Sequence, residues 1–196
     1  MLATNVPFPP YTMPSPAEGK LTERAIVIAA QRGSDDAFSA LVRIHQRRSY
    51  AIVRAIVLSH EDAEDAVQEG FLHAHRALDR FRPDQPFGAW LYRIMANAAL
   101  DLVRRRKVRV AEELPETIPM PFRDPAESRE LRQRLQEALT HLSSRQRAVI
   151  VMHDVEGYTH GEIGRTLGIP EGTARSDLHH ARATLRKLLQ NLRSTS

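Results

Sequence analysis

Apolar residues recur at helical spacing along most of the chain, and the alternating β-branched runs typical of strands are not found. In the first segment the residues that recur at roughly helical spacing are Phe38, Leu41, Val42, His45, Ile52, Val53 and Ile56. Ser59 and Asp62 then resemble a capping box, which predicts the start of another helix. Its buried stripe is predicted to be Ala63, Val67, Phe71, Ala74 and Leu78.

Residues 87–107, FGAWLYRIMANAALDLVRRRK, predict a helix that combines aromatic, apolar and cationic side chains. The predicted inward stripe is Trp90, Leu91, Ile94, Ala98 and Leu102. A second stripe, which we expect on the opposite side, is Arg93, Asn97, Asp101 and Arg105. These polar residues either form a binding surface or are simply solvated, with the aromatic residues in the core.

Prolines and acidic residues divide the chain. Residues 1–22 include five prolines and predict a disordered tail, and residues 110–127 predict a flexible, acidic, proline-rich linker. Helical spacing returns at Leu131, Leu135, Leu139 and Leu142 and continues through Val149, Ile150 and Met152. We therefore expect an all-α protein with two small helical domains, 23–109 and 128–196.

The second block has the helix start and stop signals of a helix-turn-helix. Gly157 can close one helix, Thr159 with Glu162 predicts a capping box for the next, and Gly168 and Pro170 separate that helix from the last. The last helix carries the apolar stripe Ala174, Leu178, Ala181, Leu185 and Leu188. An ordinary helical hairpin is the alternative for this segment alone.

Composition excludes several classes of function. The chain of 196 residues has no cysteine, which rules out disulfides and thiolate chemistry and fits a reducing cytoplasm. Its early apolar run, 25–30, is too short to span a bilayer, so we expect a soluble, non-exported protein. The nine histidines lack metal-site spacing, and no phosphate loop or nucleophile elbow appears, so we expect no metal, no cofactor and no enzyme.

Positive charge and aromatic rings are concentrated in one place. Between Arg76 and Arg109 there are nine Lys/Arg and three Asp/Glu, a net of +6, whereas the whole chain is only +4. Phe81, Phe87, Trp90 and Tyr92 lie in the same region. Rings that stack on bases beside cations that neutralise phosphates suit unpaired nucleic acid.

Three runs in order, DAEDAVQEGFLHAHRAL (62–78), FRPDQPFGAWLYRIMANAALDLVRRRK (81–107) and GYTHGEIGRTLGIPEGTARSDLHHARATLRKLL (157–189), resemble the extracytoplasmic-function sigma factors of bacterial RNA polymerase. The resemblance implies a polymerase-binding surface on the first run, at Asp65, Gln68 and Glu69. It implies that the second run opens promoters at the minus-ten element. The residues implied there are Phe81, Arg82, Asp84, Trp90, Arg93, Asn97, Asp101, Arg104 and Arg105.

The third run is similar to the helix that reads the minus-thirty-five element. The outward positions implied are Glu171, Thr173, Arg175, Ser176, His179 and Arg182. Two residues depart from the family pattern: Gly164 replaces a more usual alanine, and Asp177 occupies a position that is often basic. Pairing with Arg175 or Arg182 would offset the charge of Asp177.

The resemblance implies core RNA polymerase and promoter DNA as partners, and an anti-sigma factor as an inhibitor. Two alternatives stay open. A stand-alone helix-turn-helix repressor needs only the second block and leaves the cationic, aromatic helix unexplained. A sigma mimic that titrates an anti-sigma factor keeps the fold and does not need the DNA-facing residues.

Overall fold

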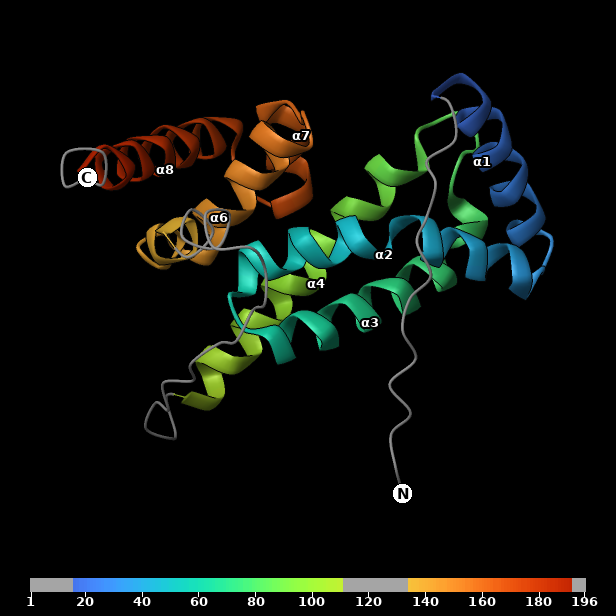
Figure 1. Cartoon of the computed structure of the whole chain (residues 1–196), viewed down its shortest axis with the longest axis horizontal. Helices are drawn as coiled ribbons and strands as arrows, with labels where there is room; N and C mark the ends of the chain where they lie inside the picture. Colours follow the sequence, from blue (N-terminus) through green and yellow to red (C-terminus); the bar gives the residue numbers. More distant parts are fainter. Residues whose placement is uncertain (1–15, 111–133, 192–196) are drawn as a thin grey trace.

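The computed structural model describes residues 16–110 and 134–191, and within these ranges it contains helices and loops but no strand. The helices shown in Figure 1 are α1 (Pro16–Gln31), α2 (Asp35–Val57), α3 (His60–Ala77), α4 (Phe87–Val110), α6 (Ser144–Ile150), α7 (His160–Leu167) and α8 (Glu171–Asn191). A 3-10 turn, η1 (Leu78–Arg80), follows α3, and a π-helical segment, η2 (Val151–Val155), follows α6. Residues 134–140 are also helical. The predicted all-α class is confirmed.

The first helix begins earlier in the chain than the sequence predicted. Helix α1 begins at Pro16, inside the segment 1–22 that was predicted to be a tail. A proline fits the first turn of a helix because the N–H that it lacks has no partner there. Residues 1–15 and the part of the predicted linker at 111–127 lie outside the described residues.

Local capping explains where the helices of the first half start. The Ser34 hydroxyl accepts from the Ala37 N–H at 3.2 Å, and Asp35 and Asp36 lie at the positive end of the α2 dipole. The Ser59 hydroxyl likewise accepts from the Asp62 N–H, so α3 begins where the sequence predicted. These caps fix the short connections between α1, α2 and α3.

Helices α1 to α4 pack around a shared apolar core that contains Leu41, Ile56, Leu91 and Met95. Helix α4 contacts α1, α2 and α3 and also α6 and α7 of the second half. Its buried surface is therefore wider than the predicted stripe. The buried residues added to that stripe are Phe87, Tyr92, Met95, Ala96, Ala99 and Leu100.

The second half confirms the helix-turn-helix. Thr159 and Glu162 form the predicted capping box of α7, and Gly168 ends the helix with a left-handed φ of 64°. Gly164 lies against the turn, since a Cβ there would be 2.8 Å from the Ile169 carbonyl oxygen. The helix predicted to continue through Met152 instead changes to the π-helical η2 after Ile150.

The two halves pack directly against each other. Figure 1 shows α6 and α7 beside α2 and α4, with α3 on the far side of the first bundle. One cluster of buried apolar residues runs without a break from Leu91 in α4 to Val149 and Met152 in the second half. The first turns of α4, which carry the predicted DNA-binding residues Trp90 and Arg93, therefore lie at the junction of the two halves.

Candidate nucleic-acid interfaces

The aromatic residues before and within α4 form one packed cluster. Phe81 and Phe87 are buried, and Trp90 is half-buried between them, with ring centroids 4.9 Å from Phe81 and 5.4 Å from Phe87. Phe81 therefore faces the core, not solvent, and supports the loop from within. Of these three rings, Trp90 keeps the most exposed surface.

A pocket of about 450 Å³ lies beside this cluster. Its wall from the first half includes Arg80, Arg82 and Arg93 together with Trp90. The other wall comes from the second half and carries two carboxylates and one aromatic ring. These residues are Glu156, Tyr158 and Glu162. A cationic and aromatic pocket of this kind matches the chemistry of a nucleotide, whereas its acidic wall does not.

Arg93 occupies the border between the two walls. Its guanidinium carbon lies 5.6 Å from the centroid of the Tyr158 ring, in cation–π contact. Burial raises the pKa of the Tyr158 hydroxyl to about 12, so this hydroxyl is a neutral hydrogen-bond donor at physiological pH. The sequence predicted a fully outward Arg93, but the second half leaves it only partly exposed.

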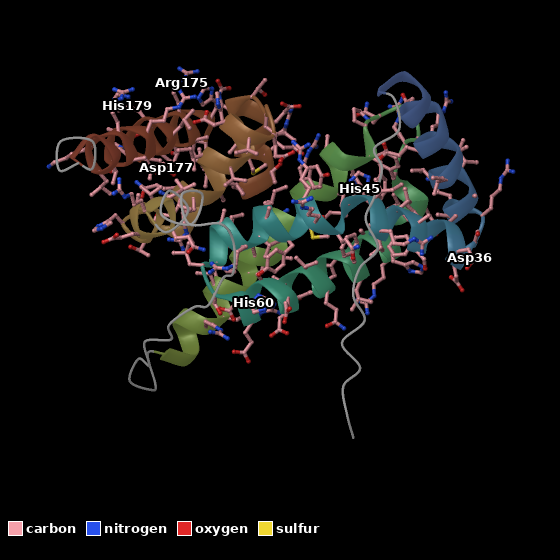
Figure 2. The ribbon with its side chains drawn as sticks, in the orientation of Figure 1. Asp36, His45, His60, Arg175, Asp177 and His179 are labelled. Carbon is pink, nitrogen blue, oxygen red and sulfur yellow. The ribbon has the colours of Figure 1, made fainter. Side chains whose placement is uncertain are left out.

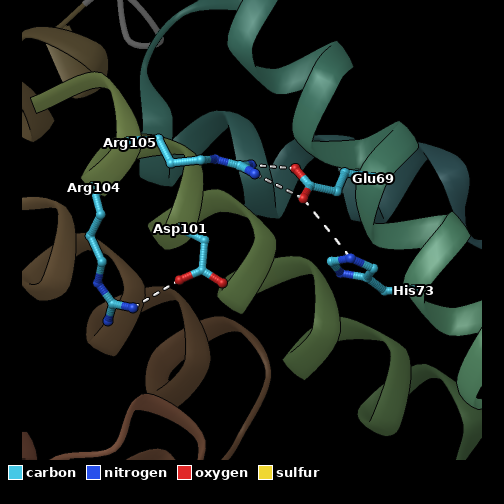
Figure 3. Close-up of polar contacts among 5 residues, drawn as sticks. All are labelled: Glu69, His73, Asp101, Arg104 and Arg105. Atoms are coloured by element: carbon cyan, nitrogen blue, oxygen red, sulfur yellow. Dashed lines mark hydrogen bonds and ion pairs between the residues drawn. The ribbon is translucent and has the colours of Figure 1, made fainter. Parts of the chain in front are cut away.

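The remaining polar residues of α4 form an exposed row. Asn97, Asp101, Arg104 and Arg105 are all exposed, as the second predicted stripe requires. Three of the four are paired, as Figure 3 shows: Arg104 donates to Asp101 at 2.8 Å, and Arg105 donates twice to Glu69 of α3, at 3.2 and 2.5 Å. Part of the positive charge of this row is thus neutralised within the chain.

The predicted polymerase-binding residues gather on one face of α3. Asp65 and Gln68 are exposed, whereas Glu69 is half-buried and lies between Arg105 and His73. The hydrogen bond from Arg105 holds the pKa of the Glu69 carboxyl below its usual range. Glu69 therefore connects the surface assigned to polymerase with the row assigned to DNA (Figure 3).

Helix α8 carries the second predicted surface. The predicted residues are exposed, except for the half-buried Thr173, and Figure 2 shows Arg175 and His179 on the outer edge of the helix. Arg175 donates to Glu171 at 2.9 Å, and Arg182 donates to Asp154 of η2 at 3.0 Å. Ser176 lies 3.4 Å from the ring of His180. The arrangement leaves a row of donors and acceptors facing outward.

Asp177 does not belong to that row. It is buried and accepts from Arg145 of α6 at 2.6 Å, so the expected pairing with Arg175 or Arg182 is wrong. The physical reason is its position on the inner side of α8, where α6 supplies the nearest cation (Figure 2). Its carboxylate therefore helps to hold α6 against α8 and does not face DNA.

Sequence reasoning missed the residues that join the two halves. Arg147 is buried and donates to the Ile56 carbonyl at 2.7 Å and to the Leu139 and Leu142 carbonyls at 3.3 and 2.5 Å. Burial lowers the pKa of its guanidinium to about 10. The sequence offers one signal for this buried role: Arg147 is a cation that stands directly before the apolar run Ala148, Val149 and Ile150.

Neither a metal site nor a membrane-spanning helix is found within the residues that the structure describes. They contain no group of three or more histidine, aspartate or glutamate residues placed to hold a metal ion. The same residues include no helix long and apolar enough to cross a membrane.

Comparison with protein families matches both halves of the chain. Residues 41–109 match Sigma-70 region 2, and residues 132–185 match Sigma-70, region 4. The chain is 36% identical over 168 residues to the ECF RNA polymerase sigma factor SigM of Mycobacterium tuberculosis, covering 86% of this chain and 85% of the relative. It is 30% identical to the ECF RNA polymerase sigma factor SigW of Bacillus subtilis, covering 83% of this chain and 94% of that relative.

Solved structures with a similar fold include two proteins bound to partners. The structure of CnrH in complex with the cytosolic domain of CnrY matches with a TM-score of 0.60 and 31% identity, covering 86% of this chain and 97% of the other. The sigma factor RpoE of Bartonella quintana, in complex with the anti-sigma factor NepR, matches with a TM-score of 0.65 and 26% identity. That match covers 78% of this chain and 96% of RpoE.

Proposed function

The chain belongs to the extracytoplasmic-function sigma factors of RNA polymerase, and we propose that its two halves divide promoter recognition between them. As a sigma factor it acts in transcription initiation, where it directs core RNA polymerase to promoters. The proposed division gives the minus-ten element to α4 with its preceding loop, and the minus-thirty-five element to α8. Catalysis stays with the polymerase, and the role places the protein in the cytoplasm.

The exposed row on α4 carries the minus-ten proposal. Asn97 offers both a donor and an acceptor, Asp101 an acceptor, and Arg104 and Arg105 bind phosphate. The row continues toward the pocket through Arg93, which leads to Arg82, Asp84 and Trp90. A strand that follows this path meets phosphate-binding cations first and a ring-lined pocket at its end.

The outer face of α8 supports the minus-thirty-five proposal. An α-helix fits the major groove, where an arginine can bind guanine in bidentate fashion and a glutamate can accept from cytosine. Arg175 and Glu171 are one helical turn apart and exposed, and His179 lies one turn further. The ion pair between Arg175 and Glu171 holds these two side chains above the same stretch of the groove.

Two protein partners complete the proposal. Core polymerase binds the face of α3 that presents Asp65, Gln68 and Glu69, since exposed acidic and amide groups suit a basic surface. An anti-sigma factor is proposed as the inhibitor, supported by the likeness to RpoE, which was solved with the anti-sigma factor NepR. A stand-alone repressor has no use for the first half, which matches Sigma-70 region 2.

The deciding experiment measures promoter opening. Holoenzyme made with the full chain should render thymines at the minus-ten element reactive to permanganate, and Asn97→Ala should abolish that reactivity. Binding to a minus-thirty-five duplex should persist, because it depends on the other half. An artificially pre-melted promoter should partly restore activity to the variant, whereas unreactive thymines with the wild-type holoenzyme would refute the proposal.

The polymerase-binding face has its own test. Replacing Asp65, Gln68 and Glu69 together with alanine should weaken holoenzyme assembly while helicity is retained. Substitutions at exposed positions such as Asp65 and Gln68 usually change stability by about 0.5 kcal/mol or less, and the ion pair that Glu69 makes with Arg105 is worth only about 0.2–1 kcal/mol. Assembly can be followed by gel filtration with core polymerase, and helicity by circular dichroism. Undiminished binding to the core enzyme would remove this assignment.

A further inference from the structure

We propose that two ion pairs fix the rotation of α8 about its own axis, and that Arg182, which the resemblance places on DNA, is a positioning residue in one of them. The inference rests on the proposed function, because it concerns how α8 presents its outer face to the minus-thirty-five element. It takes one residue out of the predicted DNA-reading set and gives Asp154 of η2 and Asp177 of α8 a part in promoter recognition. The argument starts from what holds α8 in place.

The apolar contacts of α8 define its rotation only weakly. Within the described part of the helix, its buried apolar residues are Ala174, Leu178 and Ala181. Two of these three are alanines, which offer few atoms for packing compared with a larger side chain. A small rotation of the helix would therefore cost little in these contacts, although it would change which side chains face DNA.

The first ion pair ties α8 to α6. The Asp177 carboxylate accepts from Arg145 Nε at 2.6 Å and from Arg145 Nη2 at 3.4 Å. The Asp177 side chain is only 10% exposed, so the helix presents this carboxylate to α6 and not to solvent. Hydrogen bonding to Asp177 raises the pKa of Arg145, and the pair is ionised at physiological pH.

The second ion pair ties α8 to η2. Arg182 donates through Nε to one carboxylate oxygen of Asp154 at 3.0 Å, and through Nη2 to the other oxygen. Two parallel hydrogen bonds of this kind fix the direction of both side chains. The partners are 28 residues apart in the chain, whereas the pair of Arg175 and Glu171 links only residues of α8 itself.

Two histidines extend the second pair to α7. His153 Nδ1 lies 2.9 Å from Asp154 Oδ1 and donates to it, since a carboxylate oxygen only accepts. The His153 ring centroid lies 4.8 Å from that of His160, the first residue of α7. The hydrogen bond from Arg182 holds the pKa of Asp154 below its usual range, so this carboxylate is ionised at physiological pH. Asp154 thus stands at the centre of the contacts among η2, α7 and α8.

The two ion pairs, which we call the α8 clamp, hold the helix from two directions. Asp177 and Arg182 are five positions apart, which places them about 140° apart around a helix of about 3.6 residues per turn. The pairs also differ in polarity, because α8 supplies the anion to α6 and the cation to η2. Rotation of α8 would move both side chains away from their partners, so the clamp opposes it.

Arg182 is therefore matched to a carboxylate and not to DNA. Its Nε and Nη2 groups are both used on Asp154, which neutralises its charge. A phosphate that took Arg182 would leave Asp154, which is 31% exposed, as an unpaired anion beside the DNA backbone. The outward positions that remain for reading DNA include Arg175 and His179 (Figure 2).

Asp154→Asn gives the sharpest test, because the rival explanations predict the opposite sign. Simple electrostatics predicts tighter DNA binding, and an Arg182 released to a phosphate would also steepen the salt slope by about 0.9. The clamp predicts binding weaker by about three- to tenfold, the size expected for loss of a contact between coupled residues, with an unchanged salt slope. Fluorescence anisotropy measures both, with a minus-thirty-five duplex selected from a random pool by the wild-type full chain.

Discrimination between duplexes separates positioning from a loss of structure. Asp154→Asn should weaken binding to the selected duplex more than binding to a scrambled duplex of the same composition, because rotation of α8 affects the contacts with bases most. A variant that was merely less stable would show a lower midpoint in denaturant and a smaller active fraction, with the ratio of the two affinities unchanged. An unchanged ratio would overturn the proposal.

Exchange of the two charges supplies a rescue. Arg182→Asp alone places two carboxylates together and should weaken binding to the selected duplex at least as much as Asp154→Asn does. Combined with Asp154→Arg, it restores an ion pair of the same net charge and should recover most of the lost affinity. Absence of recovery, or a salt slope lower by about 0.9 in Arg182→Gln, would assign Arg182 to a DNA phosphate and overturn its positioning role.

The matched control is Glu137→Gln, which removes one negative charge from an exposed position of the same half. It should leave both the affinity for the selected duplex and the ratio of affinities unchanged. An equal effect in Glu137→Gln and Asp154→Asn would show that net charge, rather than the clamp, sets the discrimination.

The wild-type chain separates failure of this role from failure of the proposed function. If the wild-type chain selects a preferred duplex and Asp154→Asn binds that duplex equally well or better, the clamp is wrong while the assignment of α8 stands. If the wild-type chain selects no duplex, the assignment of α8 to the minus-thirty-five element fails, and the positioning role fails with it.

Discussion

At the scale of single residues, the pair of Glu69 and Arg105 links two surfaces that the sequence treats separately. The sequence places Glu69 on a polymerase-binding helix and Arg105 at the end of a DNA-binding helix, 36 residues later. Neither motif indicates that the two side chains meet, because their contact depends on how α3 packs on α4. Positions on a helix face could be predicted from periodicity, whereas partners across helices could not.

Glu69→Gln should therefore strengthen binding of the free chain to single-stranded minus-ten DNA. The substitution releases Arg105 for phosphate, and an exposed pair of this kind is worth about 0.2–1 kcal/mol, so we expect a gain of about fivefold or less. The salt slope should steepen by about 0.7, the value for one phosphate contact on a single strand. Fluorescence anisotropy at several salt concentrations measures both quantities.

Asp65→Asn supplies the control for that measurement. It removes the same charge from the same helix, but Asp65 is exposed and does not pair with Arg105. An equal gain in both variants would show that net charge, rather than release of Arg105, sets the affinity.

At the scale of elements, caps were predictable and the helix that follows α6 was not. Thr159, Glu162 and Gly168 mark the bounds of α7 through local hydrogen bonds and backbone geometry, which depend only on neighbouring residues. The π-helical η2 has no comparable local signal: the apolar spacing through Met152 suits either kind of helix. Glu156 and Tyr158, which contact Arg48 and Ala89 of the first half, follow directly after it.

Gly164→Ala should destabilise the helix-turn-helix, even though alanine is the better helix former. A Cβ at this position would lie 2.8 Å from the Ile169 carbonyl oxygen, a backbone atom that moves only with the turn. We expect a loss of about 1–3 kcal/mol in the free energy of unfolding, with weaker minus-thirty-five binding as a consequence. Denaturant unfolding of the full chain measures the first effect, and duplex binding measures the second.

Gly161→Ala is the matched substitution in the same helix. Its Cβ would lie 3.4 Å from a side-chain oxygen of Glu171, which can move away, so stability should be unchanged or slightly raised. If Gly164→Ala were equally tolerated, the turn would be looser than its geometry indicates, and the departure from the family's usual alanine would carry no structural meaning.

At the scale of the whole molecule, the sequence predicted two helical blocks but not their mutual packing. The acidic, proline-rich segment at 110–127 separates the blocks along the chain, and its composition alone favours domains that are placed by their partners. The structure joins them through Arg48, Arg147 and Tyr158, contacts between residues about 70 to 110 positions apart. No periodicity within either block carries that information.

Limited proteolysis of the full chain tests both the division into two blocks and the packing of one block against the other. We predict that brief digestion cuts first between Val110 and Glu127, whereas preferred cleavage within 60–105 would refute the division into two blocks.

Because the halves share a buried apolar cluster and the contacts of Tyr158 and Glu156, the two fragments of the nicked wild-type chain should elute together in gel filtration. The same nick in the Arg48→Gln and Tyr158→Phe double variant should release them, since the tether that kept the effective concentration high is gone and the junction is weakened. Fragments that separate in the wild type would show that the linker alone holds the halves together.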